Sequence, residues 1–240
     1  MLFIPLSKWN RFKKIGTEYG GWFIPNDIKL DSRSIVYSAG VGEDISFDLQ
    51  LSSNYNCNIL LIDPTPRSLI HFQEVQKYYS TNNWLFTGNI QKDYKSNIEG
   101  INIDFSKIKF LPLGLWDENS ESKFYKQNNK KNVSQTLIDN MFGRNYNIVQ
   151  TTTIKNLMHK ENHYHIDLLK IDIEGAEIRV LNNMLNDQIY PTYLCVEFDL
   201  KLKGRDPGKE TKQTISRLKD EGYKVLIKNN LNITFYHKNK

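Results

Sequence analysis

Short apolar runs that alternate with helical patterns constrain the fold of this chain more than any other feature. Residues 34–39 and 58–63 are runs of the kind that form buried strands. Each run is followed by apolar residues at helical spacing, over 47–55 after the first and over 69–79 after the second. A strand–helix–strand–helix order predicts a parallel sheet with crossover helices.

The second half of the chain continues this pattern and then changes it. Further strands are expected at 108–113, 167–172 and 193–198. A helix around 209–221 leads to two β-rich runs, 223–227 and 233–236, which Asn-rich turn residues separate. We therefore expect an α/β fold with a doubly wound, mostly parallel sheet that a C-terminal antiparallel hairpin closes.

Length and composition predict one soluble domain. The 240 residues contain 39% hydrophobic and 25% charged residues, the ordinary mix of a globular protein. No apolar run approaches the roughly 18 residues of a membrane span, and the two cysteines cannot form a disulfide framework. We expect a single domain over 1–240, with an N-terminal lead-in at 1–33 and an insertion at 119–165, in a cytoplasmic protein without a membrane partner.

The net charge of +5 is unevenly distributed along the chain. Residues 201–240 contain 11 basic and 4 acidic side chains. This end of the chain is either a solvated, Lys-rich surface or a positive rim that attracts an anionic substrate. We favour the solvated surface, because no Arg cluster or aromatic ladder points to nucleic acid.

A glycine-containing turn, Gly40-Val41-Gly42-Glu43-Asp44, follows the first predicted strand. Ligands bind at the carboxyl ends of strands in such sheets, and glycines let the backbone approach a ligand closely. A dinucleotide site would have a third glycine where this chain has Ile45, and acidic residues disfavour a pyrophosphate. Glu43 and Asp44 instead suit a cationic ligand. The alternative is a plain tight turn in which Asp44 caps the next helix.

The second predicted strand ends at Asp63, about 20 residues after the glycines, where a carboxylate can accept hydrogen bonds from both ribose hydroxyls of an adenosyl ligand. Asp63 also suits helix capping, as does Thr65, which Pro66 follows at the first helical position. Because the glycine turn lies at the right distance, we favour ligand binding.

Two further segments contain candidate site residues. The segment Gly114-Leu115-Trp116-Asp117 offers an apolar wall and an acceptor for an adenine ring, although Trp116 alone is better explained as a core residue. The segment 170–177 places Lys170, Asp172 and Glu174 at alternate positions at the end of a buried strand, which is costly unless the charges are paired or used. One explanation is a Lys–Asp salt bridge that only caps the sheet. We expect Glu177 on the exposed face of the next helix.

The segments 36–44, 62–66 and 169–177 together resemble the FkbM-type family of S-adenosylmethionine (SAM)-dependent methyltransferases. The resemblance runs from about Tyr19 to Asp199, and the block around 170–177 is its most specific part. It implies the class I methyltransferase fold, which is Rossmann-like, and transfer of methyl groups to oxygen on sugars or polyketide-like small molecules.

The resemblance also implies roles for individual residues. The methionine end of SAM would lie at the glycine turn, the ribose at Asp63, the adenine at Leu115 and Trp116, and the departing methyl group at Asp172 and Glu174. The expected cofactor-binding residues are Gly40, Val41, Gly42, Glu43, Asp44, Asp63, Thr65, Leu115, Trp116 and Asp172. Three residues depart from the family pattern: Ser38 replaces an acidic residue, Asp44 replaces the third glycine of the turn, and Asp199 stands where many relatives have His.

We expect a SAM-dependent O-methyltransferase that acts on a sugar or a nucleotide-linked sugar. The candidate general bases, in order, are Glu174, Asp172 and Glu197, and Ser134 and Arg144 are candidate substrate contacts in the insertion. We expect no metal. A degenerate adenosyl-binding module and a nucleic-acid methyltransferase remain as alternatives, of which the second is disfavoured.

Overall fold

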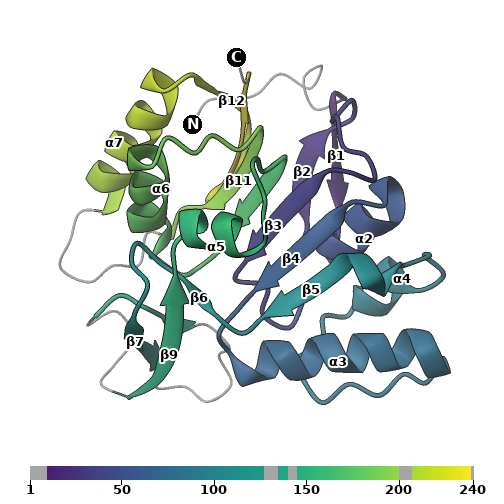
Figure 1. Ribbon diagram of the computed structural model, residues 1–240. Coiled ribbons are helices and arrows are strands. Elements are labelled where there is room, and N and C mark those ends of the chain that lie inside the picture. The colour runs from purple at the N-terminus through teal and green to yellow at the C-terminus, as the bar shows by residue number, and fades with distance from the viewer. Residues whose placement is uncertain (1–9, 127–134, 140–144, 200–206, 239–240) are drawn as a thin grey trace.

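The computed structural model describes residues 10–126, 135–139, 145–199 and 207–238. A seven-stranded sheet with the order β12-β13-β11-β10-β3-β4-β5 runs through the middle of the molecule (Figure 1). Its strands are β3 (Ile35–Ala39), β4 (Asn58–Ile62), β5 (Ile108–Leu111), β10 (Leu168–Ile171), β11 (Tyr193–Glu197), β12 (Tyr223–Asn229) and β13 (Asn232–His237). The prediction of an α/β fold is confirmed, because helices cover both faces of this sheet.

Strand direction changes only at one edge of this sheet. Strands β5, β4, β3, β10 and β11 pair in parallel. Strand β13 is antiparallel to β11, and β12 is antiparallel to β13. The five parallel strands therefore place their carboxyl ends along one edge of the sheet, where ligands bind in open α/β sheets.

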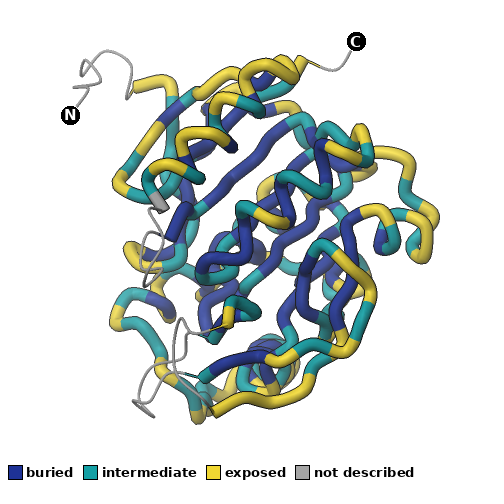
Figure 2. Tube along the Cα trace, turned by 90° about the vertical axis from the view of Figure 1, so that its left-hand side faces the viewer, coloured by how far each residue is buried: buried dark blue, intermediate teal, exposed yellow. Residues whose placement is uncertain are grey.

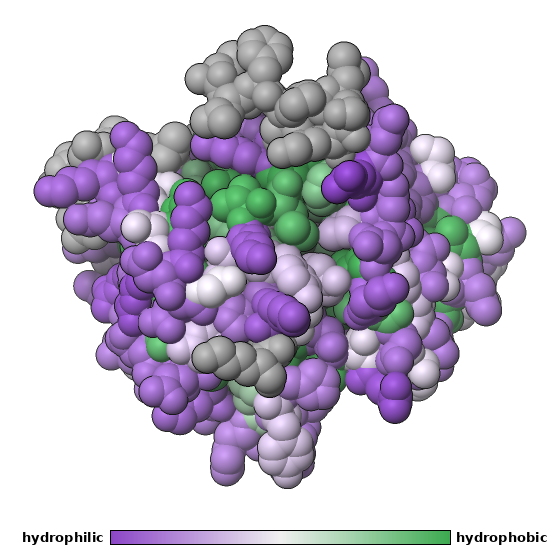
Figure 3. All heavy atoms as spheres, turned by 90° about the horizontal axis from the view of Figure 1, so that it is seen from above, coloured by the Kyte–Doolittle hydropathy of each residue, from purple (hydrophilic) through white to green (hydrophobic). Residues whose placement is uncertain are grey.

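Side chains that alternate along the strands build two separate cores. Val36 of β3 packs with α2 (Ser46–Tyr55), α3 (Pro66–Thr81) and α4 (Tyr94–Ile98), whereas the next residue, Tyr37, faces the other layer. That layer consists of α5 (Ile154–Lys160), α6 (Glu177–Asn186) and α7 (Pro207–Asp220). Figure 2 shows the buried strands between the more exposed outer layers. Hydrophilic side chains dominate the face seen in Figure 3, around a smaller apolar area.

An N-terminal hairpin occupies part of the segment expected to be a polar lead-in. Strands β1 (Phe12–Ile15) and β2 (Trp22–Pro25) pair in antiparallel register. Trp22 and Ile24 are buried in the first core, and the backbone carbonyl of Phe23 accepts a hydrogen bond from Thr234 of β13. The hairpin therefore packs onto the central sheet, and the turn between β1 and β2 lies close to the glycine turn.

A second, smaller sheet has the order β6-β9-β7-β8. Three of its strands lie within the segment 119–165 that was expected to be an insertion, and β6 lies just before it. Its strands are β6 (Gly114–Leu115), β7 (Glu121–Lys126), β8 (Gln135–Thr136) and β9 (Tyr146–Thr152). In Figure 1 it extends below the carboxyl ends of the central strands. Among the helices of the described residues, none combines the length and apolar character that a membrane span requires.

Candidate functional site

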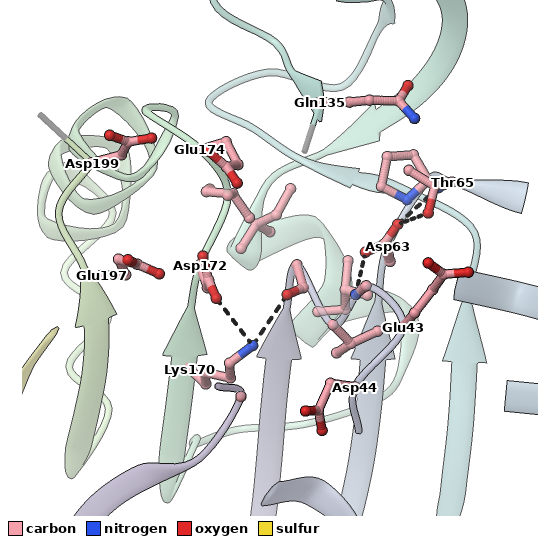
Figure 4. A pocket seen from close by; sticks show the side chains of 18 of the residues that line it. Glu43, Asp44, Asp63, Thr65, Gln135, Lys170, Asp172, Glu174, Glu197 and Asp199 are labelled. Carbon is pink, nitrogen blue, oxygen red and sulfur yellow. Dashed lines mark hydrogen bonds and ion pairs between the residues drawn. The ribbon is translucent and has the colours of Figure 1, made fainter. Parts of the chain in front are cut away.

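A cavity of about 620 Å³ opens where the parallel strands end (Figure 4). Gly40 follows β3, Asp63 follows β4, Asp172 follows β10 and Glu197 ends β11, and all four line this cavity. Residues that are as much as 157 positions apart in sequence therefore meet because parallel strands end on the same edge. The position is the one that the sequence predicts for ligand binding.

The two glycines of the turn have the same kind of backbone angle but different surroundings. Both adopt left-handed backbone angles, with φ of +72° at Gly40 and +55° at Gly42. A Cβ atom on Gly40 would lie 1.6 Å from the carbonyl oxygen of Asp172, so the turn packs directly on the 170–177 segment. A Cβ on Gly42 would meet nothing within 4 Å. Gly40 is therefore needed for close packing, and Gly42 faces open space in the cavity.

Glu43, which was expected to suit a cationic ligand, lines the cavity but is paired with a cation of the chain itself. The Glu43 carboxylate accepts hydrogen bonds from Arg67 of α3, at 2.7 Å from Nη2 and 3.1 Å from Nε, and one from the backbone N–H of Asn89. Its side chain is 6% exposed. The Arg67 guanidinium balances this charge, so Glu43 fixes the turn against α3.

Asp44 differs from Glu43, because the hydrogen bonds that it accepts come from uncharged donors. Its Oδ1 accepts from the backbone N–H of Ser46 at 3.0 Å and from the Ser46 hydroxyl at 2.6 Å. Its Oδ2 accepts from the hydroxyl of Thr17 at 2.5 Å. These donors orient the carboxylate without supplying a compensating charge. Asp44 therefore remains a source of negative potential at the wall of the cavity.

Asp63 both holds the turn and faces the cavity. One carboxylate oxygen accepts from the backbone N–H of Gly42 at 2.9 Å. The other accepts from the backbone N–H and the hydroxyl of Thr65, at 2.8 and 2.7 Å, while Thr65 also caps α3. These contacts use three of the roughly four acceptor positions of a carboxylate. Thr65 and not Asp63 is therefore the cap of α3, and about one acceptor position of Asp63 remains open at the cavity.

Leu115 and Trp116, both expected at the adenine, have different surroundings in the structure. Leu115 is buried and lines the cavity. Trp116 is absent from the described lining residues, and the guanidinium of Arg179 lies over its ring at 4.5 Å from the centroid. Arg179 also pairs with Asp117 at 2.7 Å. Trp116 therefore packs as part of a structural cluster, and Leu115 is the residue of this pair that reaches the site.

Lys170 connects the 170–177 segment to the glycine turn. Its side chain is 5% exposed, and Nζ donates to the carbonyl oxygen of Gly40 at 3.1 Å and lies 3.9 Å from Oδ2 of Asp172 (Figure 4). Strand β10 ends at Ile171, and Glu174 has a left-handed φ of +53°. Asp172 and Glu174 therefore reach the cavity from a turn, and the expected salt bridge coexists with a place in the site.

Glu197 and Asp172 form a coupled pair of carboxyl groups. Burial raises the pKa of Glu197 to about 8, and the negative charge of Asp172, a hydrogen bond with Asp172 and the charge of Glu174 add to this shift. The protonated form of Glu197 is therefore favoured by its surroundings. Two carboxyl groups thus lie side by side at the cavity.

The expectation that Glu177 lies on an exposed helix face is wrong. Glu177 begins α6 and is 0% exposed. Its two carboxylate oxygens accept from the backbone N–H groups of Gly175 at 2.8 Å and Asp199 at 2.9 Å. Burial raises its pKa to about 8 although these hydrogen bonds lower it. Glu177 therefore ties the segment after β10 to the segment after β11.

Several lining residues were not predicted from the sequence. They are Glu18, Tyr19, Gly20, Asn89, Gln91, Phe124, Gln135, Leu137, Asp199 and Asn232, together with residues flanking the predicted ones. Six of them come from the N-terminal hairpin and from the smaller sheet with the residue that follows β8, and no local sequence motif predicts those positions. The predicted substrate contacts Ser134 and Arg144 lie outside the described residues.

Within the described part of the chain, no group of three or more His, Cys, Asp or Glu has the arrangement of a metal site.

Comparison with known proteins identifies the family of this chain. A family model described as the methyltransferase FkbM domain matches residues 33–225, most of the chain. No curated protein matches the sequence.

Solved structures resemble this one at low sequence identity. A methyltransferase of Podospora anserina, PaMTH1 bound to SAH, is 8% identical with a TM-score of 0.44, and the match covers 86% of this chain and 72% of that one. A putative rRNA methylase from Clostridium thermocellum is 10% identical with a TM-score of 0.41, over 87% and 89%. Aeropyrum pernix fibrillarin with natively bound S-adenosyl-L-methionine is 11% identical with a TM-score of 0.37, over 86% and 66%.

Proposed function

The chain belongs to the FkbM family of SAM-dependent methyltransferases, and from that premise we propose that it methylates a hydroxyl oxygen of a small molecule, a sugar or a nucleotide-linked sugar. The observation that carries the proposal is a single cavity that joins the glycine turn, Asp63 and the Asp172–Glu197 pair. The strand pairings support the class I architecture that belongs to this proposal, a mostly parallel sheet closed by an antiparallel hairpin. We also propose that the chain is one domain in which 119–165 is a substrate-side insertion.

The residues present fit SAM. Gly42 leaves open space at the turn, where the methionine end would lie, and Asp44 provides negative potential for a cationic ligand. Asp63 has an acceptor position for a ribose hydroxyl, and Leu115 offers an apolar contact for adenine. The cavity volume of about 620 Å³ lies in the ordinary range of ligand pockets. Bound SAM supplies a methyl group on a sulfonium that is already activated for displacement.

The chain's own contribution to the reaction is alignment, exclusion of water and removal of a proton. A sugar hydroxyl is a poor nucleophile until its proton leaves, so a nearby base accelerates attack. Among the three candidates, Glu197 has a raised pKa, because it is buried and lies beside the charges of Asp172 and Glu174, which makes it the weakest proton acceptor at neutral pH. We therefore place Asp172 and Glu174 nearest to the acceptor hydroxyl, with Glu197 as the hydrogen-bonded neighbour of Asp172.

The charges of the described lining favour an uncharged acceptor group. Eight of these residues are acidic and one, Lys170, is basic. Phosphate groups would be repelled from such a cavity, whereas hydroxyl groups can donate to its carboxylates. For a nucleotide-linked sugar, we propose that the sugar enters and the phosphates stay outside. Phe124, Gln135 and Leu137 of the smaller sheet line the same cavity, which supports a substrate-side role for that sheet.

The test is a methyl-transfer assay with isotope-labelled SAM. Acceptors would be free sugars, nucleotide-linked sugars and RNA, and the matched variants are Asp172→Asn in the site and Asp220→Asn on the exposed end of α7. We expect label on a sugar, loss of at least tenfold in rate with Asp172→Asn, and no change with Asp220→Asn. Label that appears on RNA and on no sugar would overturn the proposed acceptor, and equal rates in both variants would overturn the role of Asp172.

A further inference from the structure

The turn between β1 and β2 lies at the mouth of the cavity. Glu18, Tyr19 and Gly20 belong to the cavity lining, together with the glycine turn and the ends of β10 and β11. The turn comes from the N-terminal hairpin, outside the residues that the family model matches. The structure thus adds a wall to the site that the family model does not cover.

The backbone of this turn is held firmly against the start of α2. The hydroxyl of Thr17 donates to Oδ2 of Asp44 at 2.5 Å, and the backbone N–H of Thr17 donates to the Ser46 hydroxyl at 2.9 Å. The backbone N–H of Gly20 donates to the Thr17 hydroxyl at 2.8 Å. Thr17 is fully buried. The position of the turn is therefore fixed relative to the wall of the cavity.

The packing of Gly20 shows how closely the turn approaches that wall. A Cβ atom at Gly20 would lie 2.7 Å from the carboxyl carbon of Asp44, a distance that real side chains do not show. The turn therefore rests directly on the Asp44 carboxylate. Tyr19 lies between Thr17 and Gly20 and lines the cavity, so these contacts fix the backbone on both sides of it.

The side chain of Tyr19 stands in the mouth of the cavity. It is 73% exposed, far more than the buried Thr17 that anchors it. Burial and then the negative charges of Asp172, Glu174, Glu197 and Asp44 raise the pKa of Tyr19, so these carboxylates lie near its hydroxyl. A large aromatic surface thus lies open, on a rigid backbone, among the carboxylates of the site.

We propose that Tyr19 covers the reacting end of bound SAM, with the face of its ring against the positively charged sulfonium. This inference rests on the SAM site of the proposed function. The electron-rich face of an aromatic ring attracts a cation, and the attraction strengthens when water is removed. The carboxylates around Tyr19 favour a positive group at the same place. Contact with the ligand would also bury the ring surface that is now exposed, and would exclude water from the methyl group.

The experiment compares binding of SAM with binding of S-adenosylhomocysteine, which lacks the methyl group and has a neutral thioether in place of the sulfonium. Calorimetric titrations of both ligands would be made with the wild-type chain, Tyr19→Phe, Tyr19→Ala and the control Tyr164→Ala, whose tyrosine is 91% exposed and lies outside the cavity lining. Thermal unfolding checks that each variant is folded.

We expect Tyr19→Ala to bind SAM about tenfold more weakly, while its affinity for S-adenosylhomocysteine falls much less. Tyr19→Phe keeps the ring and should stay within about twofold of the wild type for both ligands, and Tyr164→Ala should match the wild type. Equal losses for the two ligands, no loss in Tyr19→Ala, or an equally large loss in Tyr19→Phe would each overturn the inference. If the wild type binds neither ligand, the SAM site itself is refuted and the role of Tyr19 falls with it.

Discussion

Replacing Gly40 by alanine tests the contact that joins the glycine turn to the 170–177 segment, and Gly42→Ala is its matched control. Both glycines have left-handed backbone angles, so both variants carry the same kind of backbone strain, roughly 1–2 kcal/mol. They differ in what the new methyl group meets. At Gly42 it meets nothing within 4 Å, whereas at Gly40 it would lie 1.6 Å from the carbonyl oxygen of Asp172.

The extra cost of Gly40→Ala follows from two hydrogen bonds. The backbone must separate by roughly 1.5 Å before the methyl group reaches a tolerable distance from Asp172. That movement strains the bonds from the N–H of Gly40 to the carbonyl of Ile62, at 2.9 Å, and from the N–H of Asp172 to the carbonyl of Ala39, at 3.1 Å. At about 1 kcal/mol for each bond, Gly40→Ala should cost about 2 kcal/mol more than Gly42→Ala.

Thermal unfolding followed by circular dichroism measures this difference. For a chain of this size, about 2 kcal/mol corresponds to a Tm that is about 4–8 °C lower in Gly40→Ala than in Gly42→Ala. SAM titration separates the two effects further, because Gly42→Ala should weaken binding at a small cost in stability. Equal Tm values for the two variants would refute the close packing of the turn on Asp172.

Two further predictions concern buried carboxyl groups. Because the pKa of Glu197 is about 8 in the folded chain and 4.5 is its ordinary value, the stability that its proton provides is present below about pH 4.5 and is lost as the pH rises through 8. Between pH 6 and 9, the Tm of Glu197→Gln should therefore fall less than the Tm of the wild type. The same dependence of Tm on pH in both proteins would contradict the burial of this pair. Glu177→Leu leaves the backbone N–H groups of Gly175 and Asp199 without their acceptor, at roughly 1–3 kcal/mol for each group. Urea unfolding at pH 7 should show this loss of unfolding free energy. A variant as stable as the wild type would contradict the role of Glu177 in joining the segments after β10 and β11.

The central strands could be predicted from sequence because each is a short, continuous apolar run. The predicted segments at 34–39 and 193–198, for example, differ by one residue from β3 and β11. Burial on both faces of a parallel sheet makes such runs conspicuous. The N-terminal hairpin was missed because its strands have four residues each and only some of their side chains are buried.

The candidate site was predictable where a strand end carries the functional residue, as at Asp63 and Asp172. It was not predictable where a partner comes from a distant element. Glu43 pairs with Arg67, which lies 24 positions later in α3, and Glu177 accepts a hydrogen bond from the backbone N–H of Asp199, 22 positions later. Charge balance and burial of this kind depend on tertiary packing, which no local pattern records.

The most direct test of this account is a calorimetric titration of the whole chain with SAM and, separately, with NAD. The glycine turn, the acidic wall and Asp63 predict one SAM bound per chain at micromolar affinity and no response to NAD. Absence of SAM binding, or NAD binding of comparable strength, would contradict the assignment of this cavity to SAM.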